Sequence, residues 1–154
     1  MTVIGTEAID RVLARTVHGW DGDIPTLAKL AAPVPGVPPG LRPRFSVVIP
    51  CFNYGRFLPS SVGSVLDQGD VEVEVIIVDD ASTDGSLAVA EEMAAADPRI
   101  RVVAHRQNAG HVVTFNDGFE VATGEFIVRL DADDLLSVGS LARAAALFVA
   151  FPTV

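Results

Sequence analysis

The chain has 154 residues, of which 49% are hydrophobic and 20% charged, so it can form one domain with a hydrophobic core and is not a disordered polymer. The net charge of −9 argues against nucleic-acid binding, because an acidic surface repels phosphate backbones. Cys51 is the single cysteine, which excludes an internal disulfide and a cysteine-based metal cluster. The sequence shows neither a signal peptide nor an apolar run of membrane-spanning length, so we expect a cytoplasmic protein without a transmembrane segment.

Residues 1–44 differ in character from the rest of the chain. An amphipathic helix is expected from Thr6 to Val17, and the proline-rich stretch 33–43 reads as an extended linker. This segment is either a small helical cap on the main domain or the tail of a preceding module. We therefore divide the chain into a helical extension with a linker, 1–44, and a main domain, 45–154.

Strand and helix patterns alternate four times after residue 44. Strands are expected over 45–50, 73–79, 100–105 and 126–131. Helices are expected over 55–68, 84–96, 110–122 and 137–149, with Ser82 and Ser137 as caps of the second and fourth. This alternation predicts an α/β fold with a mainly parallel sheet and helices on both of its faces.

Acidic residues follow two of the predicted strands. Asp79 and Asp80 end one apolar run, and the segment 131–134, which contains three aspartates, ends another. Ligands of open α/β sheets bind just beyond the carboxyl ends of the strands. Two acidic groups at such ends predict a site for a nucleotide and a divalent cation, which would let an acidic protein bind a diphosphate.

Four sequence motifs occur together in the main domain. They are FSVVIPCFNY at 45–54, VDDASTDGS at 78–86, the stretch from Asn108 to Glu125, and LDADD at 130–134. In their order and spacing these motifs resemble family 2 glycosyltransferases. The resemblance implies a GT-A fold with strand order 3-2-1-4 and inverting transfer of a sugar from a nucleotide-diphospho-sugar, such as a UDP- or GDP-sugar.

The residues predicted by resemblance to bind the nucleotide-sugar are Pro50, Phe52, Asp80, Asn116 and Asp131. Asp80 would accept a hydrogen bond from the ring N–H of the base, which favours a base with a donor there, such as uracil or guanine. Pro50 and Phe52 would shape the base pocket, and Asn116 would face the nucleotide. The alternatives are that Asp79 or Asp80 only caps a loop, that Phe52 belongs to the core, and that Asn116 packs.

Asp131 and Asp133 stand two positions apart where a strand ends, a spacing that places both side chains on one side of a continuing strand. By resemblance Asp133 binds Mn²⁺ or Mg²⁺, and Asp131 faces the metal or the ribose. The alternative is a solvated turn. His111, at the start of the third helix, is expected to be solvated, and His105 has no assigned role.

The catalytic residues are not assigned. Inverting transfer requires a base for the acceptor hydroxyl, and by resemblance this base is expected beyond Val154. The apolar ending 147–154 suggests that a further C-terminal half or an oligomer contact covers it. We therefore expect the chain alone to bind the donor but to transfer sugar to its acceptor, an unidentified glycan or lipid, poorly. The alternative is a non-catalytic or truncated binding or assembly module of the same fold.

Overall fold

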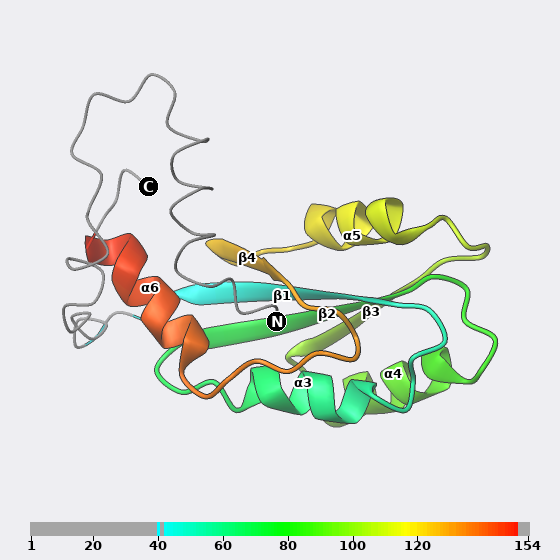
Figure 1. Ribbon diagram of the computed structural model, residues 1–154, viewed down its shortest axis with the longest axis horizontal. Helices are drawn as coiled ribbons and strands as arrows, with labels where there is room; N and C mark the ends of the chain where they lie inside the picture. Colours follow the sequence, from blue (N-terminus) through cyan, green and yellow to red (C-terminus); the bar gives the residue numbers. More distant parts are fainter. Residues whose placement is uncertain (1–39, 41, 151–154) are drawn as a thin grey trace, which may run out of the picture. The chain divides into compact units, whose positions relative to one another are not determined.

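The computed structural model describes residue 40 and residues 42–150. The helical extension and linker predicted for residues 1–44 lie almost wholly outside the described residues. Within the described part, strands and helices alternate four times, as the sequence pattern predicted (Figure 1). In this part of the chain no helix has the length and apolar character needed to cross a membrane.

The strands and helices keep the predicted order. The strands β1, β2, β3 and β4 span Arg44–Cys51, Glu72–Asp79, Ile100–Ala104 and Phe126–Arg129. The helices α3, α4, α5 and α6 span Leu58–Leu66, Ser86–Ala96, His111–Glu120 and Ser140–Ala150. Each helix begins later than predicted. For three of the helices the residue just before the first helical one is a glycine with positive φ, namely Gly85, Gly110 and Gly139, and that conformation keeps the preceding residues out of the helix.

The two predicted serine caps are wrong. Helix α4 begins after Ser82, and the oxygen that meets its first N–H, that of Ser86, is Oδ1 of Asp84 at 3.0 Å. Helix α6 likewise begins beyond Ser137. Both loops contain several residues that can accept a backbone hydrogen bond, so composition alone could not identify the one that does.

All strand pairs are parallel, in the order β3-β2-β1-β4 that the resemblance implied. Strands β1 and β2 are buried along almost their whole length, which explains their continuous runs of valine and isoleucine. Strands β2 and β3 follow one another on one side of β1, whereas β4 pairs with β1 on its other side. The strand order therefore reverses at β1. A crevice at the carboxyl ends of β1 and β4 follows from this reversal.

Helices cover both faces of the sheet, as predicted. One face packs α3, α4 and α6 against alternate residues of the central strands, including Val47, Ile49 and Ile77. The other face packs α5 against Val48, Ile76 and Val78. Figure 1 shows α5 on one side of the strands and α3 and α4 on the other.

Helix α5 lies very close to the sheet because of Gly118. A Cβ at this position would press on Cγ1 of Val48 and stand 2.9 Å from Cγ2 of Val78. Gly110, just before the helix, has φ +85°, a backbone conformation that favours glycine. These two glycines place the first turn of α5 beside the carboxyl end of β2.

Glu74 forms a buried polar network at the opposite end of the sheet. Its Oε1 accepts hydrogen bonds from Oγ of Ser46 at 2.5 Å, from the Thr123 N–H at 2.7 Å and from the Thr123 hydroxyl at 2.8 Å. Burial alone raises the pKa of Glu74, but these hydrogen bonds outweigh burial and hold it below its usual value. The network fixes the loop that leads into β4.

Candidate functional site

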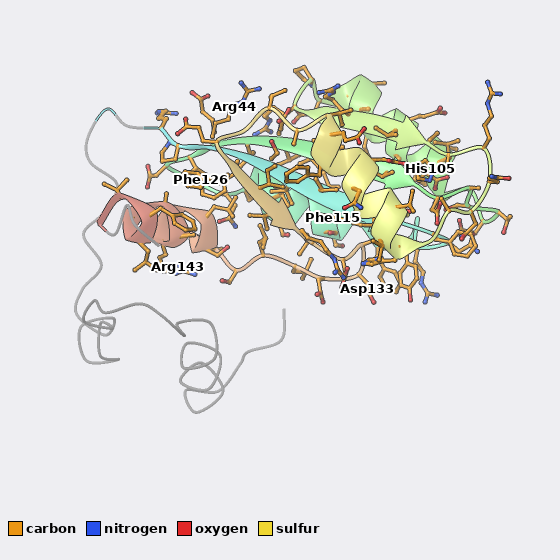
Figure 2. The ribbon with its side chains drawn as sticks, turned by 90° about the horizontal axis from the view of Figure 1, so that it is seen from above. Arg44, His105, Phe115, Phe126, Asp133 and Arg143 are labelled. Carbon is orange, nitrogen blue, oxygen red and sulfur yellow. The ribbon has the colours of Figure 1, made fainter. Side chains whose placement is uncertain are left out.

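A cleft of about 530 Å³ lies at the carboxyl ends of the strands. It contains the predicted base-pocket residues Pro50, Phe52 and Asp80 together with both predicted metal ligands, Asp131 and Asp133. The remaining lining residues come from the same loops and from the start of α5: Cys51, Tyr54, Asn108, Gly110, His111, Thr114 and Ala132. In Figure 2 His105 and Asp133 lie toward this end of the sheet, and Arg44 and Phe126 toward the other.

Two aromatic rings follow β1 on the wall of the cleft. Phe52 is 43% exposed, so the alternative that it belongs to the core is wrong. Tyr54, to which sequence reasoning gave no role, is 41% exposed and lines the same cleft. The exposed Phe52 ring could stack on a planar group, whereas the Tyr54 ring already packs against Phe57 with the ring centroids 5.6 Å apart.

The loops after β1 and β2 are joined directly. Oδ1 of Asn53 accepts the Thr83 N–H at 2.8 Å, and the Asn53 N–H donates to Oγ of Ser82 at 2.9 Å. Asn53 has φ +61° and Ala81 has φ +59°, a left-handed conformation that asparagine tolerates and that is unfavourable for alanine. The hydrogen bonds that cross between the loops hold this strained arrangement beside the cleft.

The adjacent aspartates Asp79 and Asp80 face different surroundings. Asp79 is 1% exposed, and its Oδ2 accepts the Ser82 N–H at 3.0 Å, so for Asp79 the alternative of a loop cap holds. Asp80 is 3% exposed and lies on the cleft wall. The pleat of β2 explains the difference, because consecutive residues point to opposite sides.

The carboxylate of Asp80 accepts three hydrogen bonds. Oδ1 accepts from the Ala109 N–H at 2.7 Å and from Nδ1 of His105 at 2.8 Å, and Oδ2 accepts from the Gly110 N–H at 2.9 Å. Burial alone raises the pKa of Asp80, but these donors outweigh burial and hold the pKa below its usual value. Asp80 is therefore an ionised acceptor at neutral pH.

His105 is the residue that sequence reasoning missed. It follows β3, and Ala104 pairs with Asp79, so the register places His105 next to Asp80. Its Nε2 lies 2.9 Å from Oδ2 of Asp117 on α5, the distance of an ion pair although the angle is not that of a hydrogen bond. The sequence did contain a sign of this role, because His105 is a polar residue directly after β3, the strand that pairs with β2.

The two predicted metal ligands lie in a turn. Strand β4 ends at Arg129, and the Asp134 N–H donates to the Asp131 carbonyl at 2.9 Å. The prediction that a continuing strand aligns Asp131 with Asp133 is therefore wrong in its geometry. The turn nevertheless places both side chains on the cleft, because it closes over the carboxyl end of β1.

Asp131 already has basic neighbours. Arg129 donates to its Oδ1 from Nη2 at 2.7 Å and from Nε at 3.2 Å, and Nε2 of His111 lies 3.9 Å from the same oxygen. His111, expected to be solvated, is half-exposed but lines the cleft. In the described part of the chain, no three His, Cys, Asp or Glu side chains group closely enough to hold a metal by themselves.

Asn116 is placed differently from the other predicted site residues. It is exposed on α5 and is not among the residues that line the cleft. Thr114, two residues nearer the start of α5 and so on another side of the helix, is 1% exposed and lines the cleft instead. The role proposed for Asn116 stays a prediction.

The model of a protein family described as glycosyl transferase family 2 matches residues 46–154. The chain belongs to this family. It is 38% identical over 105 residues to an uncharacterized glycosyltransferase of Nostoc, covering 68% of this chain and 33% of that protein. It is 40% identical over 93 residues to the putative teichuronic acid biosynthesis glycosyltransferase TuaG of Bacillus subtilis, covering 60% of this chain and 37% of TuaG. The chain thus spans about a third of the length of these relatives.

Solved structures of glycosyltransferases share this fold. The mannosyltransferase PcManGT from Pyrobaculum calidifontis, in complex with GDP-Man and Mn²⁺, matches with a TM-score of 0.68 and 31% identity over 81% of this chain and 38% of that one. S. aureus TarS in complex with UDP-GlcNAc matches with a TM-score of 0.64 and 30% identity over 70% of this chain and 31% of that one. The fold of the described residues is therefore of the GT-A type.

Proposed function

We propose that this chain carries the nucleotide-sugar-binding region of an inverting glycosyltransferase that uses a divalent cation. One observation supports this most strongly: the buried carboxylate of Asp80 and the exposed carboxylates of Asp131 and Asp133 line one cleft beside a free aromatic ring. The cleft lies at the point in the sheet where α/β proteins bind nucleotides. The structures of related glycosyltransferases with GDP-Man and with UDP-GlcNAc support the same assignment.

In this proposal the base binds between β1 and β2. Phe52 offers a ring face for stacking, while Pro50 forms part of the buried wall. Asp80 accepts the ring N–H of the base through an oxygen that no bulk water competes for, since the side chain is almost fully buried. The two donors from Ala109 and Gly110 keep this carboxylate in place before the nucleotide arrives.

Asp131 and Asp133 fit a Mg²⁺ or Mn²⁺ ion. Such ions commonly bind through one or two carboxylates together with phosphate oxygens, so a complete protein cage is not required. The described contacts of Asp131 with Arg129 and His111 involve Oδ1, which leaves Oδ2 for a cation. When bound, the ion would neutralise the diphosphate and the charge on the departing nucleoside diphosphate.

His111 and Arg129 complete the phosphate side of the proposed site. Both carry basic groups near Asp131, and His111 stands at the first turn of α5, where helix N–H groups also favour anions. We assign no acceptor base among the described residues. Their proposed contribution is to bind and orient the donor, which lowers the entropic cost of the transfer step.

The proposal is tested by calorimetric titration of the purified 154-residue chain with UDP and GDP, with and without Mn²⁺. We expect binding of at least one nucleotide, strengthened by Mn²⁺. Asp133→Ala should remove the Mn²⁺-dependent part, whereas Glu125→Ala, which removes an exposed acid outside the cleft, should not. Absence of nucleotide binding, or an Asp133→Ala chain that responds to Mn²⁺ like the unaltered one, would contradict the proposal.

A further inference from the structure

The hydrogen bonds to Asp80 leave its carboxylate with little free acceptor capacity. A carboxylate offers about four lone-pair positions, two on each oxygen. His105 and the Ala109 N–H occupy both positions on Oδ1, at 2.8 and 2.7 Å, and the Gly110 N–H occupies one on Oδ2, at 2.9 Å. The Thr114 hydroxyl is also close, but its one proton is donated to the Gly110 carbonyl at 2.8 Å. One position, on Oδ2, remains.

His105 is a fixed donor in this arrangement. Because Asp80 is ionised and has no proton to give, the proton in their hydrogen bond belongs to Nδ1 of His105. The ring is 12% exposed and lies between Asp80 and Asp117, with Nε2 at 2.9 Å from the second carboxylate. The hydrogen bond to Oδ1 and the near-complete burial of the ring keep Nδ1 beside Asp80.

Nucleotide bases differ in the number of donors that they present to a carboxylate. Uracil presents one ring N–H between two carbonyl groups, so it needs a single acceptor position. Guanine presents a ring N–H and an adjacent amino group, and a carboxylate that pairs with both must use both oxygens. Cytosine presents an acceptor nitrogen at the equivalent place, which a carboxylate repels.

We propose that His105 is a specificity-determining positioning residue that makes the cleft select uracil over guanine. By filling Oδ1 together with the Ala109 N–H, it leaves Asp80 able to accept one N–H and unable to accept two. A guanine base would then bind with its amino group unpaired, because the Oδ1 atom that it faces already accepts two hydrogen bonds. The inference rests on the proposed function, because it assumes that the cleft binds the base at Asp80.

The test compares UDP, GDP and CDP by calorimetry on the 154-residue chain in the presence of Mn²⁺. We expect UDP to bind at least about tenfold more tightly than GDP, the ratio that one unmade buried hydrogen bond produces, and CDP to bind weakly. In the His105→Leu chain the free position on Oδ1 should bring the UDP to GDP ratio to within about threefold. A side chain that only supported the fold would weaken both nucleotides alike and leave the ratio unchanged.

His105→Asn is the matched control. Its Nδ2 occupies the place of Nδ1 of histidine, so it keeps the donor to Asp80 while it loses the contact with Asp117. We expect this chain to keep the preference for UDP. Equal or tighter GDP binding by the unaltered chain, or loss of the preference in His105→Asn, would overturn the inference even if His105→Leu failed to fold. Absence of all nucleotide binding would instead overturn the proposed function, and the inference with it.

Discussion

The hydrogen bonds of Asp80 predict a large effect for Asp80→Asn. The substitution keeps the shape of the side chain but replaces one oxygen by an NH₂ group. If the remaining oxygen faces His105 and Ala109, the NH₂ group meets the Gly110 N–H, which now stands 2.9 Å from Oδ2. If the amide is turned the other way, two donors lose their acceptor. Either orientation places donor against donor in a site that is 3% exposed.

The expected loss of stability follows from these contacts. One buried donor left unpaired costs about 1–3 kcal/mol, and each remaining bond to a charged acceptor becomes a weaker bond to a neutral one. Together these terms predict a decrease of about 2–4 kcal/mol in the free energy of unfolding. With a urea m-value of about 2 kcal/mol/M, the unfolding midpoint should fall by about 1–2 M.

The assay is urea unfolding followed by circular dichroism at several pH values. Because the folded-state pKa of Asp80 is lowered, its contribution is present above the unfolded value of about 3.9 and is lost as the pH falls toward the folded value. The difference between the two chains should therefore shrink below about pH 4. Asp70→Asn, which removes the same charge at an exposed position with φ +62°, should change nothing. An Asp80→Asn chain with an unchanged midpoint at pH 7 would refute the reasoning.

Three further predictions concern the described core. Gly118→Ala should destabilise the chain by about 1–3 kcal/mol in thermal melts, because the added methyl group meets Val48; a raised melting temperature would contradict this. Glu74→Gln should lower stability at pH 7 and flatten the loss of stability on acidification, since the folded-state pKa of Glu74 is lowered; parallel pH curves would disprove it. Burial raises the pKa of the Cys51 thiol, so iodoacetamide should label it after unfolding in urea and scarcely before; rapid labelling of the folded chain would count against this.

The sequence alone predicted the architecture well, for a physical reason. Strands buried on both faces of a parallel sheet must be apolar without interruption, and the apolar run at 75–78 indicates such a strand. The carboxylates that follow such strands must emerge at the same edge of the sheet, so the meeting of Asp80 with Asp133 in one cleft was also within reach. The exact helix starts could not be predicted from the sequence, because several neighbouring polar residues could have capped each helix.

The tertiary structure decided what each site residue touches. The register of β2 with β3 brings His105 to Asp80, and this pairing depends on contacts across the sheet that no local pattern encodes. The turn after β4, and the pairing of Asp131 with Arg129, likewise depend on how the chain closes over β1. Local sequence determines which groups a segment carries, whereas hydrogen-bond partners are set by packing between segments distant in the chain. The chain's sequence therefore determined that a cleft rich in carboxylates exists. Only the fold decided which of these carboxylates already accept hydrogen bonds from the protein itself.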